Sequence, residues 1–236
     1  MLITYINYLL YVINIIGGLK IMKIDLNYNI NFQQLKKVQN KTFKIDDKTV
    51  LFIIDMNNGF AKKGALYSDR VQHIIPFVVD TVKNFIKLKA PIIAFTDCHT
   101  KNSIEFKYYP EHCLSDTWES ELVDELKEFK DNIKVIKKSS TNGFLEDETQ
   151  KNIKKLIDKG YKNWVISGCC TDICVKQFAE SLKAYFNKEN LDLEVIIPLN
   201  AVETYDALWH NGNAMNLFSL MEMEMSGIKL VSTVTY

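Results

Sequence analysis

The sequence has no excess of charge of either sign. Its 236 residues include 29 lysines and arginines against 29 aspartates and glutamates, so the formal net charge is zero. A nucleic-acid-binding protein is expected to show a basic excess, and attachment to an anionic membrane surface needs a cluster of basic residues. We therefore expect neither a nucleic-acid partner nor a membrane partner, and a small-molecule partner instead.

The chain also lacks the cysteine pattern of a disulfide-bonded protein. It has five cysteines, an odd number crowded into two parts of the chain, and no two pairs show the spacing of a structural zinc site. Such a set makes a poor disulfide framework and suits a reducing compartment, so we expect a cytoplasmic protein. The cysteines are Cys98, Cys113, Cys169, Cys170 and Cys174.

Residues 1–22 lack the features of a targeting segment. They are largely apolar, but no basic region precedes the apolar stretch, and Asn7 and Asn14 interrupt it. A secretory signal needs a positive start, and a spanning helix needs about 20 residues with few polar ones. We expect an extension outside the fold, with Met22 as an ordinary start; an ordered appendage and a membrane anchor are the alternatives.

After residue 30 the chain shows no internal repeat, no linker and no low-complexity segment. At 47% hydrophobic residues it can bury one sizeable core, which predicts a single domain over residues 23–236.

Short apolar runs alternate with helical patterns along this domain. A continuous apolar run such as residues 50–54 is typical of a strand buried on both faces. Strands alternating with helices imply βαβ units, so we predict an α/β fold: a three-layer αβα sandwich with a mostly parallel, Rossmann-like sheet of about six strands. The predicted strands are residues 50–54, 91–96, 133–136, 164–167, 193–197 and 228–234, and the predicted helices are residues 70–88, 118–129, 146–159, 172–187 and 206–224.

Reactive side chains follow four of these strands directly. Because ligands bind beyond the carboxyl ends of strands in open parallel sheets, these side chains are expected to meet at one edge of the sheet. They are Asp55; Asp97 with His99; Lys138; and the segment from Cys169 to Cys174.

Cys174 is a candidate nucleophile. It follows a predicted strand, a turn at Gly168 and a helix start that Thr171 or Asp172 could cap. A thiol in the first helical turn is favoured as thiolate by the helix dipole, and free backbone N–H groups there can bind an oxyanion. The alternative is that these cysteines are inert core residues.

Asp55 and Lys138 are the candidate partners of such a thiol. A carboxylate at the same edge can take the thiol proton, and an ammonium can stabilise the thiolate. Taken alone, Asp55 also fits a turn residue, and Lys138 a solvated surface lysine.

Asp97, His99, Glu105 and His112 form a candidate metal site. Residues two apart on an extended segment point the same way, so Asp97 and His99 can bind one ion, and a mixed nitrogen and oxygen set suits zinc, manganese or iron. Asp-x-His alone also occurs in ordinary loops. The other two histidines, His73 and His210, fall within predicted helices and are interpreted as structural or surface residues.

Taken together, these segments resemble the isochorismatase-like cysteine hydrolases, and within them the nicotinamidase/pyrazinamidase group. The resemblance runs from about Lys48 to the end of the chain; the segment at Cys174 is specific to the superfamily, and the two histidine motifs narrow it to nicotinamidases. The matching segments are Phe52-Ile53-Ile54-Asp55 with Asn58 and Phe60; Asp97-x-His99; Tyr109-Pro110-Glu111-His112-Cys113; Lys138 with Phe144; and Gly168 to Val175.

The resemblance implies a role for each matching residue. It implies a cis peptide bond between Cys169 and Cys170, so that the N–H of Cys170 joins that of Cys174 in an oxyanion hole. The implied catalytic triad is Asp55, Lys138 and Cys174; the implied metal ligands are Asp97, His99 and His112; and Phe60 and Tyr109 match the aromatic residues that hold the substrate ring.

Two features depart from the family or stay open. Many relatives have Trp where this chain has Tyr109, so the ring clamp is expected to differ. The fourth metal ligand varies in the family; Glu105 fits the Glu variant, and Glu111 remains an alternative. The cofactor is expected to be one divalent metal ion, zinc first, with manganese or iron as alternatives.

The resulting hypothesis is a nicotinamidase, an amidohydrolase that converts nicotinamide to nicotinate and ammonia in NAD salvage through a thioester on Cys174. The alternatives are another isochorismatase-like amide or ureido hydrolase, a metal-water hydrolase in which Cys174 only packs, and a non-catalytic binding protein. A homo-oligomer is an option by analogy with relatives.

Overall fold

The computed structural model describes residue 38 and residues 41–236. The strands of this part pair in parallel and form two sheets. Within it the main sheet has seven strands, all paired in parallel, and a second sheet pairs β1 (Thr42–Lys44) with β9 (Thr233–Thr235). The strands of the main sheet are β2 (Thr49–Ile54), β3 (Ile92–Asp97), β4 (Ile133–Lys138), β5 (Asn163–Cys169), β6 (Glu194–Pro198), β7 (Val202–Glu203) and β8 (Lys229–Val231).

The strand order fixes where a ligand crevice can lie. The order is β4-β3-β2-β5-β6-β8, with β7 paired to the end of β5. The chain moves outward from β2 through β3 to β4, and then returns to place β5 on the other side of β2. Reversal of strand order opens a crevice at the carboxyl ends of the two central strands. Asp55 follows β2 and Cys170 follows β5 at this point.

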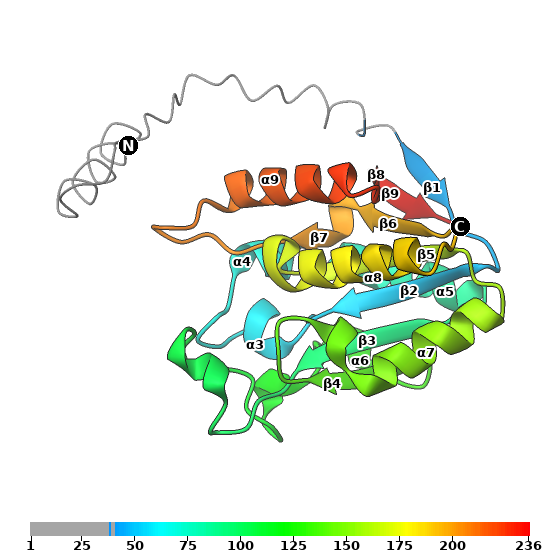
Figure 1. Cartoon of the computed structure of the whole chain (residues 1–236). Helices are drawn as coiled ribbons and strands as arrows, with labels where there is room; N and C mark the ends of the chain where they lie inside the picture. The colour runs from blue at the N-terminus through cyan, green and yellow to red at the C-terminus, as the bar shows by residue number, and fades with distance from the viewer. Residues whose placement is uncertain (1–37, 39–40) are drawn as a thin grey trace, which may run out of the picture. The chain divides into compact units, whose positions relative to one another are not determined.

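Helices cover both faces of the sheet, as Figure 1 shows for α8 in front and α5 behind. On one face Leu51 and Ile53 share a buried cluster with side chains of α5 (Ile75–Lys87). On the other face Phe52 packs against Phe178 of α8 (Lys176–Lys188), with ring centroids 5.0 Å apart. Neighbouring residues of a strand point to opposite faces, so the all-apolar β2 supplies both cores. The predicted three-layer α/β fold is confirmed.

The other helical elements connect the strands. They are α3 (Asn58–Ala61), α4 (Asp69–His73), η1 (Ile104–Lys107), η2 (Trp118–Ser120), α6 (Asp124–Lys127), η3 (Gly143–Leu145), α7 (Asp147–Asp158), η4 (Thr171–Val175), η5 (Leu199–Ala201) and α9 (Gly212–Met225).

Several predicted boundaries were wrong for local reasons. The expected helix 70–88 is divided between α4 and α5, because a proline occupies the first turn of α5 and cannot continue the preceding helix. The expected helix 118–129 is only η2 and the four-residue α6. The expected helix 206–224 begins at Gly212, where the Asn211 side chain accepts a hydrogen bond from the N–H of Ala214 at 3.0 Å. The expected strand 228–234 is divided between β8 and β9.

The expectation for residues 1–22 concerns residues outside the described ones and stays a prediction, as does the single domain over residues 23–236. Among the helices that are described, none is both long and apolar enough to cross a bilayer.

Candidate active site

The two central strands bring Asp55 and the cysteine segment together. Ile54 lies opposite Gly168 in the β2–β5 register, and Asp55 continues from β2 with a positive φ of 51°. Gly168 has a φ of +115°, and a Cβ added there would lie 1.9 Å from the carbonyl oxygen of Ile54. Only glycine fits this contact. The Sγ of Cys169 then donates to the carbonyl oxygen of Asp55 at 3.1 Å.

Lys138 lies at the end of β4, opposite Asp97 in the β3–β4 register, and its side chain is fully buried. Its ammonium forms ion pairs with Asp55 Oδ2 at 2.8 Å and Asp97 Oδ1 at 2.9 Å, and it donates to the carbonyl oxygen of Ser140 at 2.9 Å. The sequence alternative of a solvated surface lysine is therefore wrong. Lys138 joins the candidate base to the candidate metal site.

Cys174 lies in η4, a five-residue π-helical turn that continues into α8. The carbonyl oxygen of Cys170 accepts from the N–H groups of Ile173 and Val175, at 3.0 and 3.1 Å, and not from that of Cys174. The Cys169–Cys170 peptide bond is cis. The expected cap was wrong: the turn begins after Cys170, and neither Thr171 nor Asp172 caps it.

The surroundings of Cys174 indicate that its thiol needs a base in order to lose its proton. Although part of Cys174 reaches the surface, burial raises the pKa of its thiol well above the ordinary value, and the nearby charge of Lys138 lowers it by less. The charge of Lys138 favours the thiolate, as expected, but does not outweigh burial, so the thiol needs a base. Burial also raises the pKa of Asp55, to about 6, against the opposing charge of Lys138.

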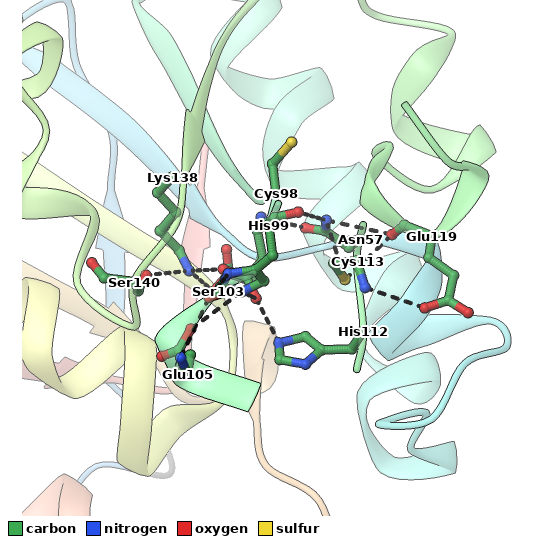
Figure 2. A network of polar contacts seen from close by, with 12 residues as sticks. Asn57, Cys98, His99, Ser103, Glu105, His112, Cys113, Glu119, Lys138 and Ser140 are labelled. Atoms are coloured by element: carbon green, nitrogen blue, oxygen red, sulfur yellow. Dashed lines mark hydrogen bonds and ion pairs between the residues drawn. The ribbon is translucent and has the colours of Figure 1, made fainter. Parts of the chain in front are cut away.

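Three candidate metal ligands, Asp97, His99 and His112, converge beside Lys138. Figure 2 shows the two histidines with Glu105 and Lys138. Oδ2 of Asp97 lies 2.9 Å from Nε2 of His99 and 3.0 Å from Nε2 of His112, and the three donor atoms lie within 4.8 Å of one another. Glu105 Oε2 lies 3.2 Å from the same nitrogen of His99, whereas Glu111 is exposed. This arrangement favours Glu105 as a fourth ligand.

The far side of each imidazole is held by a polar partner. Nδ1 of His99 lies 3.2 Å from Oγ of Ser103, and Nδ1 of His112 lies 2.7 Å from the carbonyl oxygen of Pro110. The side chain of Asn57 bonds the backbone of Asp97 in both directions, at 3.0 and 3.3 Å. Such outer contacts orient metal-binding imidazoles, so Nε2 of each histidine faces Oδ2 of Asp97, the third candidate ligand.

The two buried aspartates have opposite electrostatic settings. Burial acts to raise the pKa of Asp97, but the charge of Lys138 and hydrogen bonds from His112 and His99 outweigh it and hold the pKa well below the ordinary value. Asp97 is thus a permanent carboxylate, as a metal ligand must be, while Asp55 titrates near pH 6. An O/N/N donor set with an adjacent carboxylate fits a zinc-like divalent ion.

Aromatic rings surround His112. The ring centroids of Phe60 and Tyr109 lie 5.7 and 6.2 Å from that of His112. Phe106, which the sequence did not single out, lies 5.6 Å from His112 and 5.3 Å from His99. The three rings supply flat apolar surface beside the candidate metal ligands.

The structure therefore gathers the predicted catalytic residues and metal ligands at one edge of the sheet. His73 ends α4 and is exposed, as expected. His210 is not in a helix; it is buried, and its Nε2 lies 2.8 Å from Asp172 Oδ2. Sequence reasoning missed Ser103, Phe106 and this pair, because their importance comes from tertiary contacts that no local pattern encodes.

Comparisons with known proteins identify the family and the fold. A family model described as the isochorismatase domain matches residues 49–227. Nicotinamidase 1 of Arabidopsis thaliana is 28% identical, over 78% of this chain and 83% of that protein. The pyrazinamidase of Pyrococcus horikoshii, solved in complex with zinc, is 27% identical with a TM-score of 0.64, covering 78% of this chain and 98% of that one. A nicotinamidase of Bacillus subtilis, at 23% identity and a TM-score of 0.66 over 78% of this chain and 99% of that one, supports the fold.

Proposed function

The chain belongs to the isochorismatase family, and from this premise we propose that it is a nicotinamidase: an amidohydrolase that converts nicotinamide to nicotinate and ammonia with Cys174 as nucleophile. The observation that carries the proposal is the position of Lys138, whose ammonium contacts both Asp55 and Asp97. Lys138 thus connects Asp55, the acid–base group near the Cys174 thiol, with Asp97, one of the metal ligands that lie near the aromatic rings.

In the first half of the reaction Asp55 takes the proton of the Cys174 thiol, and the thiolate attacks the carboxamide carbon. The N–H groups of Cys170 and Cys174 receive the negative charge that develops on the carbonyl oxygen. In comparable oxyanion holes, loss of one donor costs about 10²–10³ in turnover. Lys138 stabilises the anionic pair of thiol and carboxylate throughout.

In the second half the carbon–nitrogen bond breaks, and protonated Asp55 gives its proton to the leaving ammonia. The acyl group remains on Cys174 as a thioester. Asp55, again a carboxylate, takes a proton from water, and the hydroxide formed attacks the thioester. The carbon–sulfur bond breaks, Asp55 returns its proton to the departing thiolate, and the acid loses its own proton to solvent and leaves as nicotinate. A base with a pKa of about 6 can both accept and return a proton near neutral pH.

Asp97, His99 and His112, with Glu105 as fourth ligand, would hold a divalent ion, zinc first among the candidates. When bound, this ion supplies a Lewis acid beside the aromatic rings, suited to the ring nitrogen of a pyridine. Phe60, Phe106 and Tyr109 would hold the flat ring. A cytoplasmic setting and a role in NAD salvage accompany this proposal.

Ammonia release by metal-supplemented protein tests the proposal. Nicotinamide should be hydrolysed faster than a ureido compound or an aliphatic amide of similar size. Cys174→Ala should lower turnover by at least about 10³-fold and leave the far-UV spectrum unchanged. A faster ureido substrate would move the chain to another branch of the family, and parental turnover in Cys174→Ala would exclude the cysteine mechanism.

A further inference from the structure

A buried carboxylate lies in the same turn as the nucleophile, outside the proposed chemistry. Asp172 stands two residues before Cys174 in η4, and its side chain is only 3% exposed. Oδ1 accepts from Oγ1 of Thr204 at 2.5 Å, and Oδ2 lies 2.8 Å from Nε2 of His210. Within residues 41–236 these two side chains are its hydrogen-bond donors. A buried carboxylate depends on such donors to keep its position.

His210 is itself held in one orientation. Its Nδ1 lies 3.1 Å from the carbonyl oxygen of Tyr205, and the Tyr205 ring stacks on the imidazole with centroids 3.8 Å apart and planes 9° apart. The imidazole is buried. Stacking and the carbonyl contact together aim Nε2 at Asp172, so His210 acts as a rigid donor.

Residues 204–211, here called the strap, are also fixed from the opposite side. Nε of Arg70 donates to the carbonyl oxygen of Thr204, at one end of the strap, at 3.1 Å. Its Nη1 donates to Oδ1 of Asn213, in α9 just beyond the other end, at 2.9 Å. Arg70 comes from α4, on another part of the fold. The strap is therefore held by Arg70 of α4 at Thr204, and it contacts the turn that carries the thiol through His210.

We propose that His210 is a positioning residue that acts through Asp172: the two side chains hold the π-helical turn Thr171–Val175 in the shape that aims the thiol and N–H of Cys174 at the reacting carbon. The inference rests on the proposed cysteine chemistry. A small displacement of a nucleophile costs rate far more than it costs binding. The ring-binding residues lie on other segments, so loss of His210 should spare substrate affinity.

The test compares two substitutions at His210. In His210→Ala, kcat for nicotinamide should fall at least about tenfold while KM stays within about twofold. In His210→Gln, the amide nitrogen can restore one donor to Asp172, so most of the lost kcat should return. Retention of the parental kcat by His210→Ala would overturn the proposal. A kcat of His210→Gln no higher than that of His210→Ala would also overturn it.

A second readout does not need amide hydrolysis. The rate at which iodoacetamide alkylates Cys174, followed by mass spectrometry of the peptide, reports whether the thiol still faces Asp55 and Lys138. It should fall in His210→Ala and recover in His210→Gln. If the parent hydrolyses no amide, the proposed function fails, but these alkylation rates still decide the role of His210. Equal rates in parent and His210→Ala would overturn it.

Two further variants separate positioning from general stability. Trp209→Ala alters an exposed side chain of the same strap and should leave both readouts unchanged. If His210→Ala does not fold, Thr204→Val carries the test, because it removes the other donor to Asp172 while keeping the side-chain shape. In Thr204→Val, kcat and the alkylation rate of Cys174 should fall while KM stays unchanged. Parental values of kcat and of the alkylation rate in folded Thr204→Val would overturn the proposal.

Discussion

The ammonium of Lys138 lies 2.8 Å from Oδ2 of Asp55, and both side chains are at most 1% exposed. The same ammonium lies 2.9 Å from Oδ1 of Asp97. One buried cation therefore forms ion pairs with two buried carboxylates. Its pKa is raised well above the ordinary value, because the attraction of Asp55, Cys174 and Asp97 outweighs the opposing effect of burial.

Removal of this cation should destabilise the protein strongly. Lys138→Met keeps the length of the side chain but leaves buried Asp55 without its charged partner, while Asp97 keeps only its contacts with His99 and His112. Breaking a buried ion pair from one side costs about 3–5 kcal/mol, so the free energy of unfolding should fall by that amount in a denaturant titration. Asp55→Asn combined with Lys138→Met should recover part of the loss. A single variant as stable as the parent would contradict this view of the site.

Activity should require the carboxylate form of Asp55. Burial is the largest cause that raises its pKa to about 6 from the ordinary 3.8. Below pH 6 the fraction of carboxylate falls about tenfold for each pH unit, and kcat/KM should fall with it. Metal content measured at each pH is the control, because acid also releases metal from histidines. A flat profile down to pH 4.5 at constant metal content would exclude Asp55 as the base.

The same pKa shift predicts the effect of Asp55 on stability. Because the folded-state pKa lies above the ordinary value, ionisation of Asp55 is disfavoured in the folded state. Its contribution to stability is therefore fully present below about pH 4 and is lost as the pH rises through 6. Relative to Asp55→Asn, the parent should lose stability over this interval. Parallel stability curves for the two proteins would show that the shift is absent.

Much of the fold followed from periodicity. The buried strands are continuous apolar runs, and residues 50–54 keep this signal because both faces of β2 are covered. The grouping of reactive side chains at one edge of the sheet could be predicted from their place in the sequence, because Asp55, Asp97 and Lys138 each stand at the end of a strand. A parallel sheet then brings them together whatever the sequence separation.

Tertiary contacts decided what the sequence could not predict. Nothing local distinguishes Lys138 from the neighbouring Lys137, yet one is buried among carboxylates and the other is exposed. His210 falls within the predicted helix 206–224, but its contacts with Asp172 and Tyr205 hold that segment as an irregular strap. The contact between His210 and Asp172 joins segments about 40 residues apart, beyond the reach of a periodicity argument.

Metal removal should separate ring binding from thiol reactivity. Chelation, or His112→Ala, should raise KM for nicotinamide about 10- to 100-fold, while alkylation of Cys174 changes little. Zinc, manganese and iron added back to the chelated parent would identify the functional ion by the recovered KM. Full activity in a metal-depleted preparation would show that the ligand assignment is wrong.

Ser103 should tune the affinity for this metal without binding it. Its hydroxyl lies 3.2 Å from Nδ1 of His99 and accepts from the N–H of Glu105 at 3.4 Å, so it orients one ligand and the segment of another. Loss of such an outer contact costs about 10- to 100-fold in metal affinity. Ser103→Ala should weaken zinc binding by that factor in a competition titration with a chromophoric chelator.

Ser115→Ala is the matched control, because Ser115 Oγ bonds the same histidine at its carbonyl oxygen, at 3.1 Å, and leaves the imidazole alone. Its zinc affinity should stay within about threefold of the parent, since the orientation of Nε2 does not depend on that contact. Equal losses in the two serine variants would mean that the segment is only loosened. A loss confined to Ser103→Ala would show that the hydroxyl fixes the plane of the His99 ring.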